Sequence, residues 1–165
     1  MPENEQNKPI FDVKAYSGLY PHLIDELDSM LNELKARSIL VNIYSGLRTW
    51  EEQDKLYALG RTRKNPDGIT TSKPMGNIVT NAHGGQSWHN FGLAVDIAFL
   101  NSKGNVFWPS DADKRWTELG KLGEAFGLEW GGRWKFQDLP HFQIRGKVRT
   151  LENAQKLYKI GGTAE

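Results

Sequence analysis

The chain has 165 residues, of which 38% are hydrophobic and 25% are charged, and its mean hydropathy of −0.59 is typical of one water-soluble globular domain. The 21 Lys and Arg residues nearly balance the 20 Asp and Glu residues, so no strong field for nucleic acid or an anionic membrane is expected. The absence of cysteine excludes disulfide scaffolds, Cys-ligated zinc and thiol catalysis. No stretch approaches the roughly 18 apolar residues that span a bilayer, so we expect no membrane insertion.

Residues 1–9 are polar and predict a disordered lead-in to a single domain over residues 10–165, which we expect to be monomeric. The lead-in lacks the charged and apolar regions of a signal peptide. We therefore expect the chain to be made in the cytoplasm and to reach any substrate outside it by a route other than the usual export.

The spacing of apolar residues and the positions of turn residues predict mixed helices and strands. In chain order we expect a helix at 21–34, a strand at 38–44, a helix at 49–60, strands at 78–80 and 93–100, a helix at 110–126, strands at 128–130 and 141–144, and a helix at 150–160. Thr49 and Glu52 form a capping-box pattern, Ser110 is the expected cap of the third helix, and residues 61–87 form a long loop. Because helices and strands do not alternate regularly, we expect an α+β fold with a mainly antiparallel sheet.

The segment 93–100 is the clearest strand, and it carries a carboxylate among apolar residues. Four apolar side chains face one side of it, whereas Ala94, Asp96 and Ala98 face the other. Burying a bare carboxylate is costly or shifts its pKa, so Asp96 needs a partner. The small alanines leave space beside it, and a metal ion is an economical partner.

Two of the four histidines suit a metal site with Asp96. His89 lies in a turn before the aspartate, and His141 begins a short strand. Catalytic zinc typically takes three protein ligands and a water, so His89, Asp96 and His141 are the candidate ligands. Asp138, three residues before His141, is the candidate general base for a metal-activated water.

Each of these residues also has a structural interpretation. Asp96 can accept bonds from backbone amides, His89 can be an ordinary turn residue, and His141 can be a satisfied histidine at a strand edge. Taken one at a time, the structural interpretations are the stronger ones, because short motifs often match by chance. Taken together, with the glycine and alanine spacing around them, the residues favour a catalytic metal site.

The pattern Ser-x-His-x-x-Gly-x-Ala-x-Asp at 87–96, followed by a carboxylate-x-x-His pattern at 138–141, resembles the zinc peptidases that cut peptidoglycan stem peptides. This family includes D-Ala-D-Ala carboxypeptidases and dipeptidases, and the L-alanyl-D-glutamate endopeptidases of phage endolysins and some bacterial wall hydrolases. The likeness is closest to the endopeptidase branch and implies the hedgehog/DD-peptidase α+β fold. The matching motifs are at 45–48, 56–62, 78–82, 84–96 and 140–142.

The resemblance implies a role for each matching residue. His89, Asp96 and His141 match the zinc ligands, and Asp138 matches the catalytic carboxylate. Arg48 matches an arginine that stabilises carbonyl charge in the transition state, with a surface ion pair as the alternative.

Three further features match less directly. Ser87 matches a residue near the substrate, although capping of the His89 turn explains it equally well. Gln53 matches a family glutamine that packs near the site, and we interpret it as structural. Residues 63–77 exceed the length that the branch leads us to expect, and we interpret them as a surface insertion, with a lid or wall-binding loop as the alternative.

The remaining conspicuous residues receive structural interpretations. His83 is expected to be exposed or to touch substrate, and His22 to lie on a helix without a partner. Trp130 and Trp134 can line a cleft, but tryptophans near strands usually belong to the core. Residues 111–113 are too short for a calcium loop and are expected to supply charge at a helix start.

The resemblance as a whole implies a zinc-dependent endopeptidase that hydrolyses the L-Ala–D-Glu bond of the peptidoglycan stem and so lyses the cell wall. A phage endolysin stored in the host cytoplasm and released through a holin fits the lack of a signal peptide, and a bacterial remodelling enzyme is the alternative source. Two other functions stay open: a D-Ala-D-Ala carboxypeptidase or dipeptidase, and a non-catalytic, zinc-containing module that binds the wall.

Overall fold

The computed structural model describes residues 16–60 and 77–145. The expected lead-in, most of the long loop with its insertion, and the C-terminal helix lie outside the described residues. The helices are α1 (Pro21–Ala36), α2 (Trp50–Ala58) and α3 (Lys114–Ala125), with short 3₁₀ helices η3 (Trp88–Phe91) and η4 (Gly131–Arg133). The strands are β1 (Val41–Ser45), β2 (Ala94–Leu100), β3 (Val106–Phe107), β4 (Glu129–Trp130) and β5 (His141–Gln143).

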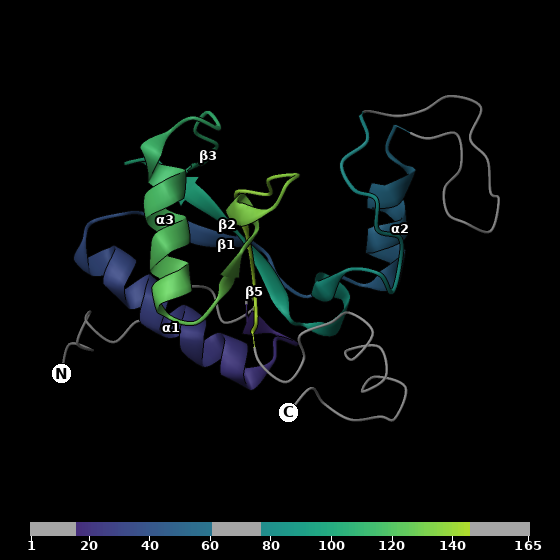
Figure 1. The fold of residues 1–165 in the computed structure, drawn as a ribbon, viewed down its shortest axis with the longest axis horizontal. Coiled ribbons are helices and arrows are strands. Elements are labelled where there is room, and N and C mark those ends of the chain that lie inside the picture. Colours follow the sequence, from purple (N-terminus) through teal and green to yellow (C-terminus); the bar gives the residue numbers. More distant parts are fainter. Residues whose placement is uncertain (1–15, 61–76, 146–165) are drawn as a thin grey trace.

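The five strands form one antiparallel sheet, which agrees with the expected α+β fold. Its strand order is β1-β2-β5-β4, and β3 pairs with β2 off this path. Figure 1 shows α1 and α3 close to the sheet on the same side and α2 set apart from both. Among the described helices, none combines the length and the apolar character needed to cross a membrane.

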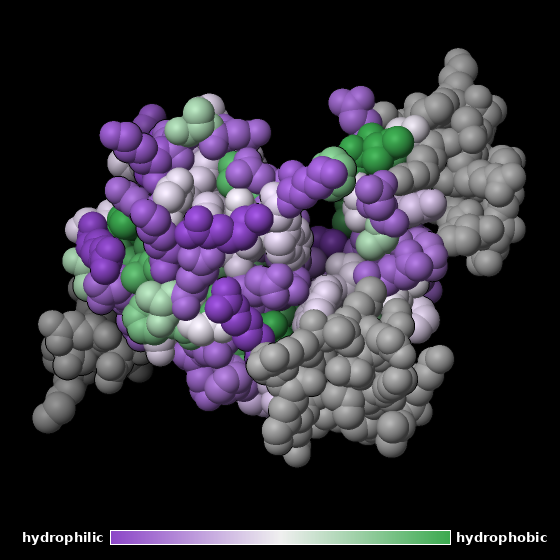
Figure 2. Space-filling view, viewed as in Figure 1, coloured by the Kyte–Doolittle hydropathy of each residue, from purple (hydrophilic) through white to green (hydrophobic). Residues whose placement is uncertain are grey.

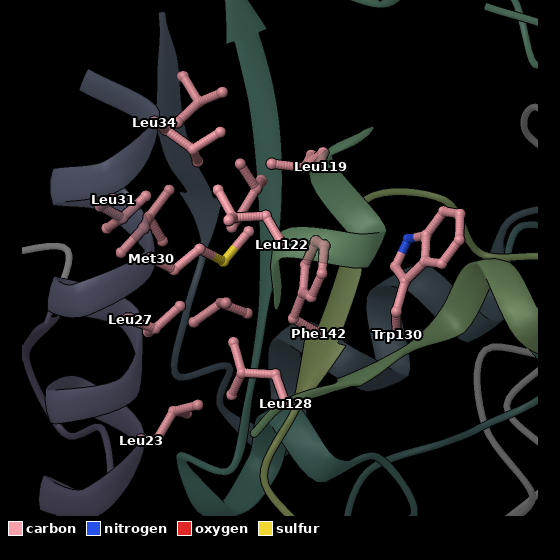
Figure 3. Close-up of a cluster of buried hydrophobic side chains, with 14 of the residues drawn as sticks. Leu23, Leu27, Met30, Leu31, Leu34, Leu119, Leu122, Leu128, Trp130 and Phe142 are labelled. Atoms are coloured by element: carbon pink, nitrogen blue, oxygen red, sulfur yellow. The ribbon is translucent and has the colours of Figure 1, made fainter. Parts of the chain in front are cut away.

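Helices α1 and α3 pack with the sheet around one apolar core. The helical spacing of its apolar residues lets α1 bury one face, made of Leu23, Leu27, Met30, Leu31 and Leu34. Figure 3 shows Met30 directed toward Leu122 of α3 and Phe142 of β5. Burying each such side chain contributes about 1.5–3 kcal/mol, so this layer holds the sheet in place.

The first strand and the third helix begin at other residues than expected. The first strand begins at Val41, not at residue 38, because Ser38 adopts a left-handed φ of 59° and its amide donates to the Lys35 carbonyl, which ends α1. The third helix is capped by Asp113, whose side chain accepts from the amide of Arg115, and not by Ser110. The expected helix-start charge in 111–113 is therefore confirmed at Asp113.

The expected strand at 78–80 is also wrong. The segment is β-branched, which favours a strand, but it finds no strand partner among the described residues, and Ile78 and Val79 are 58% and 61% exposed. Conversely, the two-residue strand β3 was not expected. The other ends of the described elements agree with expectation within about two residues.

The register of the sheet places three polar residues in one row. Ser45 pairs with Asp96, and Asp96 pairs with His141 on the other side. A bulge makes the first pairing possible, because Ile43 pairs with Ile97 and one extra residue of β1 separates the two pairs. Partners in register point to the same face, so this row projects from the face opposite the core.

Candidate metal centre

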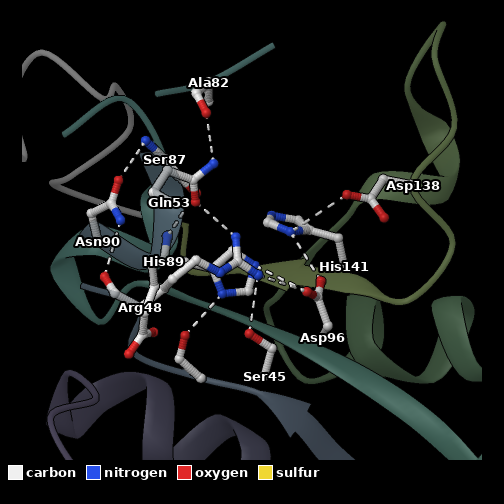
Figure 4. A network of polar contacts seen from close by, with 12 residues as sticks. Ser45, Arg48, Gln53, Ala82, Ser87, His89, Asn90, Asp96, Asp138 and His141 are labelled. Carbon is white, nitrogen blue, oxygen red and sulfur yellow. Dashed lines mark hydrogen bonds and ion pairs between the residues drawn. The ribbon is translucent and has the colours of Figure 1, made fainter. Parts of the chain in front are cut away.

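His89, Asp96 and His141 come together in the structure. One ligand atom from each residue lies within 4.8 Å of the others. His89 Nε2 lies 3.4 Å from Asp96 Oδ2, and His141 Nδ1 lies 3.5 Å from Asp96 Oδ1 (Figure 4). Both histidine side chains are buried, and the aspartate is 20% exposed, so the cluster is sheltered but open on one side.

The His89 ring is held in one tautomer. Ser87 caps η3 by accepting from the His89 amide at 3.3 Å, and Gly92 ends it with a φ of 70°. His89 Nδ1 lies 2.9 Å from the Gly46 carbonyl oxygen. Because a carbonyl can only accept, Nδ1 carries the proton, and Nε2 presents its lone pair toward Asp96.

The His141 ring is held in the opposite tautomer. Its Nε2 lies 2.9 Å from the side-chain oxygen of Gln143, which leaves the Nδ1 lone pair facing Asp96. Two neutral imidazole nitrogens and one carboxylate are the donor set of a catalytic zinc site, and metal-binding histidines are oriented through their other nitrogen in this way. The residues present therefore fit a divalent metal ion.

Asp96 is held in the anionic form that a cation requires. Burial opposes its ionisation, but when His141 and His89 are protonated, without a metal, their hydrogen bonds and charge outweigh burial and hold the pKa of this carboxyl well below its usual range. Arg48 Nη2, 3.5 Å from Asp96 Oδ2, adds a permanent positive charge on the same side. The aspartate thus keeps its charge at neutral pH.

Arg48 lies between β1 and α2, and its guanidinium is fixed by neighbouring side chains. Nη1 donates to Gln53 Oε1 at 2.8 Å, and Nη2 donates to Ser45 Oγ at 3.1 Å. The buried Gln53 amide nitrogen in turn donates to the Ala82 carbonyl at 2.7 Å. Arg48 is 16% exposed, so it is not the surface ion pair that was the alternative, and Gln53 has the expected structural position.

Asp138 lies in the segment between β4 and β5, at the edge of the cluster. Its Oδ2 lies 3.8 Å from His141 Nδ1, and its side chain is 49% exposed. Its amide donates to the Gly131 carbonyl at 3.0 Å, and its carbonyl accepts from the His141 amide at 3.2 Å, which fixes the turn. Partial burial, helped by the charge of Asp96 and opposed by that of His141, raises the pKa of the Asp138 carboxyl, as a group that takes up and returns protons needs.

The surface is hollowed near these residues. Figure 2 shows a recess between the α2 side of the molecule and the segment that joins β4 to β5. Arg48 lies two residues before α2 and Asp138 belongs to the other segment, and the two candidate catalytic residues reach the cluster from opposite sides (Figure 4).

The other conspicuous residues fall outside the cluster. His22 has a partner, contrary to expectation, because its Nε2 lies 3.2 Å from Glu26 one helical turn away. His83 is half-buried, with its Nδ1 3.2 Å from the Gly84 carbonyl oxygen. Ser87 is a cap, as one of its two interpretations required.

The two tryptophans differ from each other. Trp130 is 4% exposed and belongs to the core, as expected. Trp134 lies against the His141 ring, with the ring centroids 5.0 Å apart, so it borders the cluster.

Ser45 and Gln143 orient residues of the site, because Ser45 accepts from Arg48 and Gln143 contacts His141. Their residue types alone did not single them out. For Gln143 a signal was present, since it lies two residues after His141 on a strand and therefore shares its face. Ser45 reaches its position only through the bulge in β1, which no sequence pattern indicates.

Comparison with known proteins gives concordant matches. A family model described as D-alanyl-D-alanine carboxypeptidase matches residues 80–144, the segment that carries the whole cluster. The chain is 36% identical over 140 residues to the peptidoglycan L-alanyl-D-glutamate endopeptidase CwlK of Bacillus subtilis, a match that covers 81% of this chain and 77% of that protein.

Solved structures also show the same fold. The L-Ala D-Glu endopeptidase ChiX of Serratia marcescens superposes with a TM-score of 0.55 at 21% identity, covering 86% of this chain and 94% of that one. DacB of Streptococcus pneumoniae gives 0.54 at 19% identity, covering 90% and 80%. A vancomycin-resistance D,D-pentapeptidase, VanY, in complex with Zn(II), gives 0.52 at 19% identity, covering 87% and 80%. These likenesses confirm the fold that the sequence resemblance implied.

Proposed function

Because the chain belongs to the family of peptidoglycan peptidases that includes D-alanyl-D-alanine carboxypeptidases and L-alanyl-D-glutamate endopeptidases, we propose that it is a zinc-dependent endopeptidase that hydrolyses the L-Ala–D-Glu bond of the peptidoglycan stem. The observation that carries this proposal is the cluster of His89, Asp96 and His141, in which both rings aim a lone pair at the carboxylate. The choice of bond is supported by the 36% identity to the endopeptidase CwlK.

His89 Nε2, the Asp96 carboxylate and His141 Nδ1 would hold the zinc ion. When bound there, zinc supplies a Lewis acid that polarises the scissile carbonyl and makes water more acidic. The buried rings and their fixed tautomers keep the ligand atoms in place, so little reorganisation is needed on binding.

The remaining chemistry belongs to Asp138 and Arg48. Asp138 takes a proton from the attacking water on its exposed carboxylate and returns it to the leaving amine nitrogen. Arg48 donates to the carbonyl oxygen as negative charge develops there, and Gln53 and Ser45 keep its guanidinium oriented. Contact of Ser87 with the substrate stays a prediction, since its cap of η3 already accounts for it.

A D-alanyl-D-alanine carboxypeptidase is the second candidate, because the family model that matches residues 80–144 carries that description. A non-catalytic wall-binding module is disfavoured by the placement of Asp138 and Arg48 beside the candidate ligands. Lysis of the wall follows from cleavage of the stem peptide. Release through a holin and a phage origin stay predictions.

Mass spectrometry of purified peptidoglycan digested with the protein tests the proposal. We expect fragments with new amino-terminal D-glutamate. Free D-alanine in their place would show the carboxypeptidase, and wall binding without new amino termini would show the non-catalytic module.

A further inference from the structure

The His141 imidazole belongs to a closed ring of contacts that extends behind the metal centre. Its Nε2 lies 2.9 Å from Gln143 Oε1, and Gln143 Nε2 donates to Glu129 Oε2 at 3.4 Å. The other oxygen of Glu129 accepts from Trp134 Nε1 at 3.1 Å. Trp134 closes the ring of contacts, because its ring centroid lies 5.0 Å from that of His141, with an angle of 48° between the two ring planes.

Each hydrogen bond in this ring of contacts has only one possible donor. An ionised carboxylate only accepts, and Glu129 faces two N–H donors, one from Gln143 and one from Trp134. The amide nitrogen of Gln143 must therefore point to Glu129, and its oxygen must point to His141. Nε2 of His141 then has to donate, which leaves the lone pair on Nδ1.

The sheet register builds this ring. Gln143 and Glu129 are partners in the β4–β5 ladder, and Gln143 lies two residues from His141 along β5. All three side chains therefore project from the same face of the sheet. Gln143 is 5% exposed and His141 is 6% exposed, so solvent does not readily replace their hydrogen bond.

We propose that Gln143, Glu129 and Trp134 are positioning residues that hold the His141 imidazole with Nδ1 toward Asp96. In this proposal the Glu129 carboxylate fixes which group donates and which accepts in every hydrogen bond of the ring of contacts. This inference rests on the metal site of the proposed function. It assigns a role to three residues that do not touch the metal or the substrate.

A pair of isosteric exchanges tests this assignment of donors and acceptors. In Glu129→Gln an amide has one acceptor oxygen, so one of the two donors loses its partner. In Gln143→Glu two carboxylates face each other. The double variant Glu129→Gln/Gln143→Glu restores every donor–acceptor pair. The carboxylate introduced at position 143 accepts from His141 and from the amide nitrogen introduced at position 129, and the oxygen of that same amide accepts from Trp134.

The zinc dissociation constant of each full-length variant is measured by competition with a chromophoric chelator. We expect Glu129→Gln to weaken zinc binding by roughly 10- to 100-fold, because the Gln143 amide is then free to turn its nitrogen toward His141, and the double variant to return the affinity to near the wild-type value. Gln143→Glu alone should not show this loss, because its carboxylate still accepts from His141 Nε2. Glu124→Gln is the matched control, because Glu124 pairs with Arg133 and has no link to His141, and its zinc affinity should not change. A Glu129→Gln variant that binds zinc as tightly as the wild type, or a double variant as weak as Glu129→Gln, would overturn the proposal.

A second measurement needs no substitution. In ¹H–¹⁵N spectra of the wild-type protein with neutral His141, the ring proton is expected on Nε2, and a proton on Nδ1 would contradict the proposal. A wild-type protein that binds no zinc would contradict the proposed function. The nitrogen of His141 that carries the proton would still show whether Gln143, Glu129 and Trp134 orient the imidazole as proposed. Cleavage of a different peptide bond would change the proposed function and leave the affinity comparison intact.

Discussion

Asp96 of β2 and His141 of β5 are register partners, and Asp96 Oδ1 lies 3.5 Å from His141 Nδ1. Adjacent strands lie about 4.8 Å apart, so this pairing by itself brings two ligand atoms within reach of one ion. Ser45 continues the same row on β1 and holds Arg48. The register of the sheet therefore sets the geometry of the site, and the following predictions depend on it.

Asp138→Asn should lower kcat by about 10²- to 10⁴-fold, because the amide cannot take a proton from water. Zinc affinity should stay near the wild-type value, since this carboxylate stands outside the three-ligand cluster. Turnover of a purified muropeptide and chelator competition measure the two quantities. Asp113→Asn, which alters the cap of α3 and the ion pair with Arg115, is the control. Loss of zinc binding with Asp138→Asn would instead make this residue a ligand.

Arg48→Lys should lower kcat by about 10²- to 10³-fold with a smaller change in KM, because one ammonium cannot bond Gln53 and Ser45 and still point at the substrate carbonyl. Steady-state kinetics on the same muropeptide separates the two constants. Arg37→Lys, at an exposed ion pair with Glu33, should leave both unchanged. A rise in KM alone would show that Arg48 binds substrate without stabilising the transition state.

Gln53→Leu should lower the free energy of unfolding by about 1–3 kcal/mol, because the Ala82 carbonyl and one Arg48 donor lose their partner. Activity should fall as well, since the guanidinium is no longer held from that side. Denaturant unfolding and kinetics measure the two effects. Gln86→Leu changes an exposed glutamine and should cost much less stability. Equal losses in both variants would argue against the assigned role of Gln53.

Gly92→Ala should be more destabilising than Gly104→Ala, although both glycines have a left-handed φ, 70° and 79°. The conformational cost of about 1–2 kcal/mol is common to both. At Gly104 a Cβ meets nothing within 4 Å, whereas at Gly92 it would collide with the Gly18 carbonyl oxygen and displace η3. Gly92→Ala should therefore also weaken zinc binding through His89. Equal unfolding free energies for the two variants would contradict this account.

Two of the described helices and the residues of the cluster can be predicted from the sequence, for physical reasons. The apolar spacing of α1 and the capping box at Thr49 and Glu52 are local signals, and both elements form where they indicate. A carboxylate in an apolar strand and two turn-adjacent histidines are also local, so His89, Asp96 and His141 can be named from the sequence.

What the sequence does not predict depends on contacts between distant segments. The β-branched residues 78–80 have strand propensity but no partner strand among the described residues, so they stay irregular. The bulge that aligns Ser45 with Asp96, and the pairing of Glu129 with Gln143, exist only once the register is formed. The His22–Glu26 pair is different, because its helical spacing of four residues is a local signal that the sequence does carry.

The most direct test of the central claim is a muropeptide digest by protein that has been stripped of metal with a chelator, analysed by mass spectrometry with and without added zinc. The account predicts no cleavage by the stripped protein and, after zinc is restored, fragments that begin with D-glutamate. Cleavage that continues at full rate without metal, or that does not depend on His89 when it is changed to alanine, would contradict it.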